Sequence, residues 1–420
     1  MKIKFLGAVE EVGRSAILVK TEKEGFLLDS GVALDHSVKF PAYVSPDEFN
    51  TLIISHCHLD HVGSAPLFFI GGVKKALMTK MTKELSRILL LDMLKIAKTY
   101  LPFEILEINR FLQYSTEIEK DKQYKIGEDT FLEMKNAGHV LGASQILLKF
   151  KDKVLLYTGD MNVNKTRTVP PANTEYNENV DVLITESTYA TTEHPPRNQV
   201  EKELVEESRK IIEDGGKVLI PAFGVGRAQE IITVFHANNF PYKVALDGMA
   251  KKVTEIFMNN PEELYDYKQF VRAVEKTYIL QSDQERKYVT QEPGVIVTPA
   301  GMLKGGPAVK YSEEIAKGKK NAIFLVSYQV EGTPGSTLLK KKVIATGGKL
   351  VKVNAKVKQF DFSSHSGRDD YINLIKKINP KYVFFVHGSK ENVEFLFNEV
   401  SNNMKDTKAI MPKISEVYEV

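Results

Sequence analysis

Hydrophobic and polar positions in the first part of the chain follow two different periods. Short apolar runs bounded by Gly-rich turns indicate β-strands. Between them, a long stretch over residues 81–100 places apolar side chains three and four positions apart, which predicts a helix with one buried face. The predicted strands cover residues 16–19, 25–29, 51–55, 146–149 and 154–158.

The pattern changes after about residue 199, where helical stripes and apolar strands begin to alternate. Apolar positions from Val200 to Ile212 form one stripe, Gly215 and Gly216 end it, and residues 217–223 continue as an apolar strand. Repeated helix-then-strand pairs predict βαβ crossovers and a parallel sheet, so the expected fold class is α/β. Three more pairs lie at residues 227–236 with 244–247, 250–258 with 277–280 and 282–290 with 295–298.

A hairpin-like pattern returns after Lys349, followed by a predicted helix near residues 369–377 and a strand over 381–387. We therefore expect the α/β unit to interrupt a second domain that takes its segments from both ends of the chain. The expected boundaries are residues 1–188 and 348–420 for the discontinuous domain and 189–347 for the inserted domain.

Composition narrows the class of protein. The chain has 420 residues, 43% of them hydrophobic and 26% charged, without a long apolar run, which favours a globular protein of two or three domains and no membrane segment. The single cysteine, Cys57, excludes an internal disulfide framework. Met1 leads directly into apolar alternation without a signal peptide, so we expect a cytoplasmic protein.

The net charge of +3 is too small to indicate nucleic-acid binding, but one stretch is strongly basic. Residues 332–360 contain seven lysines and no acidic residue. Such a run is either an ordinary solvated surface or an electrostatic track for a phosphate backbone. The lysines are Lys340, Lys341, Lys342, Lys349, Lys352, Lys356 and Lys358.

The strongest chemical signal is the segment His56-Cys57-His58-Leu59-Asp60-His61, which follows an apolar strand. Imidazole and carboxylate groups are ligands that suit zinc or manganese. Alternate residues of an extended backbone point the same way, so His56 and His58 can bind one ion while Cys57 faces elsewhere. Asp60 and His61 lie beyond the strand, where the chain turns, and can reach a second ion.

Two further segments each carry one candidate metal ligand. His139 lies between Gly138 and Gly142, and Asp160 follows a predicted buried strand. A carboxylate has two oxygens and can bridge ions about 3.5 to 4 Å apart, a separation that suits phosphodiester hydrolysis. Asp29 also ends an apolar strand, and we expect it to orient a ligand histidine.

These residues, in this order, resemble motifs one to four of the metallo-β-lactamase superfamily. Three more segments, residues 185–189, 362–366 and 386–389, are similar to motifs A, B and C of its β-CASP branch, which includes the cleavage and polyadenylation specificity factor nuclease and ribonuclease J. Residues 301–307 and 328–333 are similar to segments of archaeal homologues of that factor, although we expect no KH domains ahead of the first strand. The resemblance implies a metallo-β-lactamase αββα sandwich with an inserted β-CASP domain, a mostly parallel sheet flanked by helices.

The resemblance also assigns ligands to two Zn²⁺ ions, with Mn²⁺ as an alternative. His56, His58 and His139 would hold one ion, Asp60, His61 and His387 the other, and Asp160 would bridge them. Catalytic roles fall to His365 as general acid, to Glu186 as the carboxylate that orients it, and to Asp60. Three histidines receive no role: His36, His194 and His236.

The implied function is zinc-dependent hydrolysis of RNA phosphodiester bonds, as endonuclease or 5′-to-3′ exonuclease, in RNA processing, 3′-end formation or decay. Single-stranded RNA is the expected substrate, and a homodimer or association with other RNA-processing factors is left open. Phe223-Gly224-Val225-Gly226-Arg227 lacks the third glycine of a dinucleotide-binding motif and is interpreted as a tight turn. The candidate phosphate contacts are Ser363, Ser364, Ser389 and Arg227.

Three alternatives compete with this reading. Small-ester and thioester hydrolases share the first four motifs but do not need Glu186, His365 or an inserted sheet. A flavodiiron oxidoreductase would carry a carboxylate in place of His58, and a non-catalytic RNA-binding subunit would not need all seven ligand positions. RNA is favoured over DNA because the DNA-directed β-CASP proteins generally lack the histidine found here as His387.

Overall fold

The chain forms two compact units. The computed structural model describes residues 1–34, 38–70, 75–97, 101–346 and 349–420. The first unit comprises Met1–Lys165, Pro170–Glu193 and Ser364–Val420, and the second comprises Thr166–Val169 and His194–Ser363. No helix in these described ranges is long and apolar enough to span a membrane.

Two seven-stranded sheets make up the centre of the first unit. In sheet order, the first consists of β24 (Val417–Glu419), β1 (Lys2–Phe5), β2 (Ile17–Lys20), β3 (Gly25–Leu28), β6 (Thr51–Ile53), β7 (Lys75–Met78) and β8 (Ser115–Glu117). The second consists of β23 (Lys408–Ile410), β22 (Tyr382–Val386), β13 (Val182–Glu186), β12 (Val154–Tyr157), β11 (Ser144–Lys149), β10 (Phe131–Asn136) and β9 (Gln123–Lys125).

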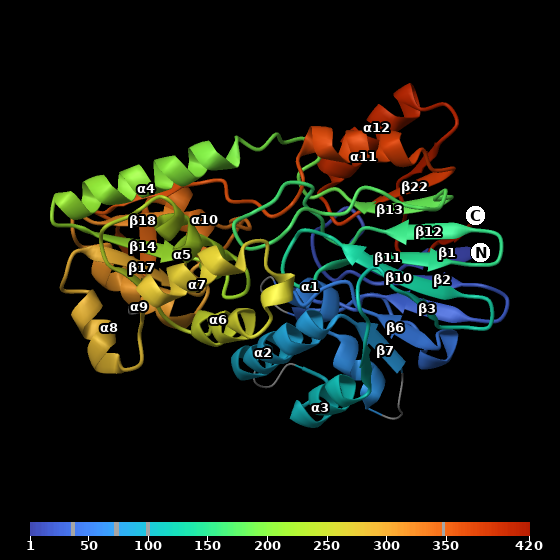
Figure 1. The fold of residues 1–420 in the computed structure, drawn as a ribbon, viewed down its shortest axis with the longest axis horizontal. Coiled ribbons are helices and arrows are strands. Elements are labelled where there is room, and N and C mark those ends of the chain that lie inside the picture. Colours follow the sequence, from blue (N-terminus) through green and yellow to red (C-terminus); the bar gives the residue numbers. More distant parts are fainter. Residues whose placement is uncertain (35–37, 71–74, 98–100, 347–348) are drawn as a thin grey trace. The chain divides into compact units, whose positions relative to one another are not determined.

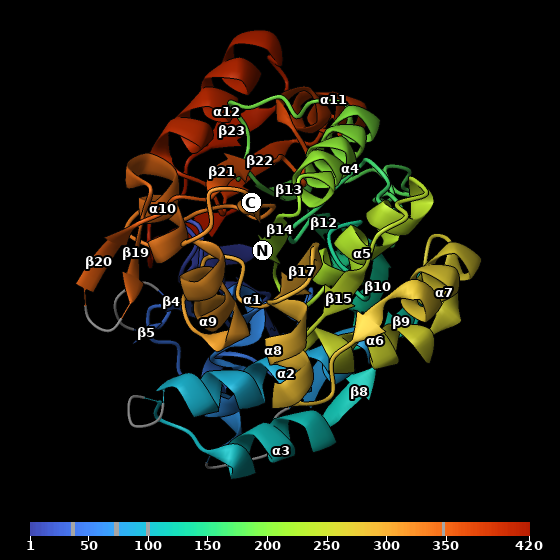
Figure 2. The same ribbon diagram turned by 90° about the vertical axis from the view of Figure 1, so that its left-hand side faces the viewer.

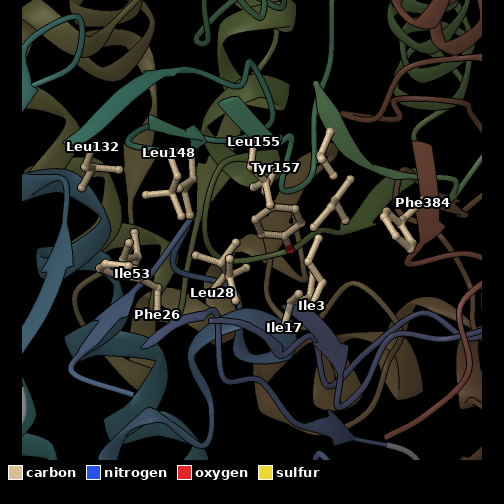
Figure 3. Packing of buried hydrophobic residues seen from close by; sticks show 14 of the residues in the cluster. Ile3, Ile17, Phe26, Leu28, Ile53, Leu132, Leu148, Leu155, Tyr157 and Phe384 are labelled. Carbon is tan, nitrogen blue, oxygen red and sulfur yellow. The ribbon is translucent and has the colours of Figure 1, made fainter. Parts of the chain in front are cut away.

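Alternating side chains assign each sheet an inner and an outer face. Ile17, Phe26 and Leu28 of the first sheet pack with Leu155 and Phe384 of the second in one buried cluster (Figure 3). The outer face of the first sheet packs on α2 (Lys80–Ala97) and α3 (Ile105–Gln113). The outer face of the second packs on α11 (Arg368–Ile378) and α12 (Lys390–Asn403), so the four layers run helix, sheet, sheet, helix (Figure 1).

The second unit contains a six-stranded sheet in which every pairing is parallel. Its strands are β16 (Tyr278–Ile279), β15 (Val244–Leu246), β17 (Gly294–Thr298), β14 (Lys217–Pro221), β18 (Ala322–Leu325) and β21 (Lys356–Gln359). The helices between them are α4 (Arg197–Glu213), α5 (Arg227–Ala237), α6 (Ala250–Met258), α7 (Tyr267–Lys276), α8 (Asp283–Val289), α9 (Gly306–Ile315) and α10 (Pro334–Lys341). A separate antiparallel pair, β19 (Val343–Thr346) and β20 (Lys349–Lys352), follows α10.

The expected α/β class, with a mostly parallel sheet in its second part, is confirmed. The compact units change at residues 193/194 and 363/364, whereas the pattern placed the domain boundaries at 188/189 and 347/348. The second difference arises because β21 pairs in register with β18 and so extends the parallel sheet by one strand. Residues 347 and 348, and residues 98–100 at the end of the expected 81–100 helix, lie outside the described ranges.

Candidate metal centre

Parallel strands of the first sheet bring two of the predicted residues to one edge. β3 and β6 pair in parallel, with Leu28 opposite Ile53, so the segments that follow both strands leave from the same end of the sheet. Asp29 comes directly after β3, and His56 follows β6 after two buried residues. His58 then precedes the short helix α1 (Leu59–Val62), which carries Asp60 and His61.

Parallel strands of the second sheet also bring predicted site residues to one edge. β12, β13 and β22 are neighbouring parallel strands, and Asp160, Glu186 and His387 lie at or just beyond their carboxyl ends. This edge is where α/β proteins bind ligands. His139 lies in the turn between β10 and β11, and His365 precedes α11.

The first cluster joins His56, His58, His139 and Asp160, whose ligand atoms all lie within 4.8 Å of one another. His58 Nδ1 is 3.2 Å from His56 Nε2 and 3.0 Å from His139 Nε2. One oxygen of Asp160, Oδ2, is 3.6 Å from His56 Nε2 and 3.7 Å from His139 Nε2. The four atoms therefore face a common point.

The second cluster joins Asp60, His61, Asp160 and His387 within the same limit of 4.8 Å. His61 Nε2 is 3.4 Å from His387 Nε2 and 3.2 Å from the other Asp160 oxygen, Oδ1. His387 Nε2 lies 3.3 Å from Asp60 Oδ2. Asp160 thus presents one oxygen to each cluster.

These spacings fit metal ligation. Four ligands placed tetrahedrally at about 2.0 to 2.1 Å from zinc are about 3.3 Å from each other. The separations in both clusters fall around this value. Moreover, Asp160 Oδ1 is buried and accepts no hydrogen bond within the described part of the chain, which is unusual for a buried carboxylate unless a cation faces it.

Electrostatics favour a cation at the same place. Burial, reinforced by neighbouring histidines, holds the pKa values of His56 and His139 well below the usual range, so both rings stay neutral and keep a lone pair for a metal. Burial alone would lower the pKa of His61, but the charges of Asp160 and Asp29 hold it well above its usual value. In Asp60, burial is outweighed by the His387 hydrogen bond, which lowers its pKa.

Hydrogen bonds outside the clusters fix the orientation of the ligand rings. His61 Nδ1 lies 2.7 Å from Asp29 Oδ2, which leaves Nε2 to face the cluster. Asp29 also accepts hydrogen bonds from the backbone N–H and hydroxyl of Ser55, both 2.7 Å, and from the Tyr157 hydroxyl at 2.9 Å. The Thr188 hydroxyl lies 3.1 Å from His387 Nδ1.

Sequence reasoning placed Asp29 beside a ligand histidine but missed Ser55, Tyr157 and Thr188. One signal for Tyr157 was available in the sequence. It is two residues after Leu155 in the same strand, so both side chains point into the core, and it is the last strand residue before the chain turns toward Asp160. Cys57 is buried and belongs to neither ligand group, and its burial raises the pKa of the thiol.

His365 and Glu186 form a third group beside the clusters. His365 Nδ1 lies 2.9 Å from both carboxylate oxygens of Glu186. The His365 ring centroid is 4.5 Å from that of His139. Burial would lower the pKa of His365, but the Glu186 charge and hydrogen bond raise it to about 9.

The predicted phosphate contacts have other partners in the structure. The Ser364 carbonyl oxygen is 2.9 Å from His139 Nδ1, and the Ser389 hydroxyl accepts the backbone N–H of Asn392 at the start of α12. Ser363 and Arg227 belong to the second unit, where the Ser363 carbonyl accepts a hydrogen bond from Arg197. Their contacts with RNA stay predictions.

The remaining histidines have no ligand role in the described structure. His194 pairs with Asp361 at 2.7 Å in the second unit, and His236 lies in α5. His36 lies outside the described residues.

Comparison with known protein families accounts for almost the whole chain. Residues 9–222 match the metallo-beta-lactamase superfamily, and residues 228–338 match the Beta-Casp domain. Residues 350–412 match the Zn-dependent metallo-hydrolase RNA specificity domain.

Several proteins resemble this chain over most of its length. RNase aCSPSF2 of Saccharolobus solfataricus is 36% identical over 93% of this chain and 80% of its own length. Probable RNase MJ4 of Methanocaldococcus jannaschii is 35% identical over 99% of both chains. Transcription termination factor FttA of the same organism is 33% identical over 93% of this chain and 67% of its own. A crystal structure of an Enterococcus faecalis protein of unknown function shares the fold, with a TM-score of 0.63, 14% identity and 99% coverage of both chains.

The two packed sheets and their histidine and aspartate clusters define a metallo-hydrolase. Within that class, the chain belongs to the β-CASP family of the metallo-β-lactamase superfamily, as the sequence motifs predicted.

Proposed function

We propose that this chain is a ribonuclease that hydrolyses RNA phosphodiester bonds with two zinc ions. The single observation that carries the proposal is the division of Asp160 between two ligand clusters, one oxygen to each, with the His365–Glu186 pair beside them. The similarity to proteins named RNase aCSPSF2 and Probable RNase MJ4 supports RNA as substrate, and the similarity to a protein named transcription termination factor FttA supports a role in RNA 3′-end formation.

The chain offers each ion a complete ligand set. His56, His58 and His139 would hold the first, and Asp60, His61 and His387 would hold the second, with Asp160 between them. When bound, two such ions lower the pKa of water and neutralise charge on the scissile phosphate. Asp29 and Thr188, through their contacts with His61 and His387, would keep these two rings turned toward the ions.

The leaving ribose oxygen needs a proton, and His365 is positioned to supply it. Glu186 accepts a hydrogen bond from His365 Nδ1. The proton that His365 would transfer to the leaving oxygen is therefore the one on Nε2. The negative charge of Glu186 also favours the protonated ring. Asp60, paired with His387, keeps its negative charge near the second ion.

Activity of the purified protein tests the proposal directly. Single-stranded RNA, labelled at its 5′ end or internally, is incubated beside DNA of matched sequence and a thioester, each with and without chelator. We expect cleavage of RNA alone and its loss on chelation. Thioester hydrolysis without RNA cleavage would identify a small-molecule hydrolase, and RNA binding without cleavage in the zinc-loaded protein would identify a non-catalytic subunit.

The mode of cleavage is a separate test. One metal centre serves both endonucleases and 5′-to-3′ exonucleases, which differ in their treatment of the 5′ end. RNA with a 5′-monophosphate, RNA with a 5′-triphosphate and circular RNA separate them, because only an endonuclease cuts the circle.

A further inference from the structure

The seven lysines of residues 332–360 divide into two groups in the structure. Three of them are neutralised by glutamates: Lys340 pairs with Glu331 at 2.6 Å, Lys358 with Glu203 at 2.5 Å, and Lys356 with Glu207. These three therefore form part of an ordinary mixed-charge surface. The predicted electrostatic track does not extend over the whole run.

The other four lysines gather on a small structure of their own. Lys341 is the last residue of α10 and Lys342 follows it as the C-cap, and Lys349 and Lys352 begin and end β20. All four are exposed, and none forms an ion pair with another residue in the described ranges. We call Lys341 and Lys342 together with β19 and β20 the lysine ribbon. Figure 2 shows β19 and β20 beside α10.

The register of the lysine ribbon separates an anchored face from an open face. Ile344 is buried in the core of the second unit, and its cross-strand partner is Val351. Ala345 and Leu350 oppose each other on the other face, where Leu350 is 69% exposed. The open face therefore carries Leu350 and Lys352, which is opposite Val343. Lys349, opposite Thr346, lies on the same face as Ile344 and Val351, and that face is open at Val351, which is 42% exposed.

We propose that the lysine ribbon is a second RNA-binding surface, which holds the phosphate backbone of single-stranded RNA without taking part in the chemistry. Four exposed cations without acidic partners give a local positive potential that the net charge of +3 conceals. The identity of the bound RNA rests on the proposed ribonuclease function. The ribbon is also the place where the match to the RNA specificity domain begins, at residue 350.

A protein partner fits this surface less well. Lysine is depleted from the centres of protein–protein interfaces, which need a contiguous apolar core. Here the described residues of the ribbon expose two large apolar side chains, Leu350 and Val351, and Lys349 and Lys352 flank them in the chain. Contacts with phosphates need neither a large apolar area nor close shape complementarity.

The test compares two variants of equal charge. One replaces Lys341, Lys342, Lys349 and Lys352 with glutamine, and the control replaces four other exposed lysines of the second unit: Lys252, Lys268, Lys276 and Lys287. Binding of a fluorescein-labelled single-stranded RNA is followed by anisotropy at several salt concentrations, with chelator present to prevent cleavage. Cleavage by the zinc-loaded proteins at saturating RNA is measured separately.

For the ribbon variant, we expect at least a tenfold higher Kd and a salt dependence weaker by about 3 in the slope of log K against log salt, at about 0.7 per lost contact. Saturated turnover should match wild type, and the control should keep most of its affinity. RNA binding as tight in the ribbon variant as in the control overturns the proposal, even if wild type cleaves RNA. If wild type does not cleave RNA but the ribbon variant alone loses binding, the ribbon is supported and the ribonuclease function fails.

Discussion

At Glu186, one buried carboxylate pairs with His365 and raises the pKa of its ring. Glu186 accepts hydrogen bonds from His365 Nδ1 and from the backbone N–H of Met161 at 2.7 Å. The Met161 contact is buried and holds the carboxylate in place, and Met161 directly follows Asp160, which faces both candidate ligand clusters. The same short stretch of backbone therefore positions both the partner of His365 and the two clusters.

Replacement of His365 separates chemistry from metal binding. His365→Ala removes the proton donor but none of the seven predicted ligands, so we expect turnover to fall about 10²- to 10⁴-fold, the range of general acid catalysis. Zinc content, measured by mass spectrometry of the metal, should be unchanged. Turnover at the wild-type rate would show that another group protonates the leaving oxygen.

Replacement of Glu186 changes the pH at which that donor works. His365 acts as an acid only while protonated, so the rate falls as pH rises through its pKa, which Glu186 raises to about 9 and bound cations lower. In Glu186→Gln the charge is lost while burial, which lowers the pKa, remains. We expect the falling limb of the pH–rate profile to move to lower pH; a limb at the wild-type position would contradict the pairing.

Local sequence was sufficient to select candidate ligands that the structure brings together, but not the residues that hydrogen-bond to them. His56, His58 and His61 could be predicted because they lie within one short segment after an apolar strand. The contact of Tyr157 with Asp29 joins residues 128 positions apart, so it depends on which strands face each other across the core. No local pattern contains that information.

At the scale of elements, the segment Thr166–Val169 is bound by buried carboxylates of the second unit. Glu230 in α5 accepts the backbone N–H of Arg167 at 3.0 Å and both the N–H and hydroxyl of Thr168. Arg167 itself makes a bidentate ion pair with Glu201 in α4. The chain therefore passes between the two units four times, whereas a single insertion requires only two passages.

Loss of the Glu230 carboxylate should release this segment. In Glu230→Ala, three hydrogen bonds to a buried charged acceptor are removed, and we expect the second unit to lose about 3 kcal/mol of unfolding free energy. Denaturant unfolding measures the loss, and hydrogen exchange should rise at residues 166–169. Glu203→Ala, which removes an exposed carboxylate of α4, is the control and should change stability by less than about 1 kcal/mol. Equal effects of the two variants would contradict the role of Glu230.

Several helices with clear periodicity were predicted, whereas α3, α7 and α12 were not, and neither were α9 and α10, which begin at Gly and Pro. The stripes of α4, α5, α6 and α8 fall within a few residues of their observed bounds. Helices α9 and α10 have Pro307 and Pro334 in their first turns, where proline starts a helix although in isolation it indicates a break. Helix α4 begins after Pro196, ahead of the apolar stripe that predicted it, and its buried Glu201 pairs with Arg167.

At the scale of the whole molecule, each of the two units has a hydrophobic core of its own, but the two differ in their candidate metal ligands. The first contains all seven predicted metal ligands, drawn from segments between His56 and His387. The second is closed by its own core, where Leu219, Ile296 and Ile323 of the parallel sheet pack on α9 and α10. The change from short strands to alternating helices and strands in the sequence predicted two units. The end of the second unit, however, depends on the pairing of β21 with β18, which the structure shows.

Removal of metal should therefore destabilise one unit and spare the other. A ligand at a thousand times its Kd stabilises the state that binds it by about 4 kcal/mol, which corresponds to about 10 °C in Tm for a unit of this size. Scanning calorimetry of the zinc-loaded protein, with and without chelator, measures the effect, and hydrogen exchange assigns each transition to its unit. We expect chelation to lower the transition of the first unit by about that amount, since its ligands span the chain, while the transition of the second unit stays in place. A single transition that moves as a whole would show that the units unfold together, and unchanged transitions would contradict metal binding by the clusters.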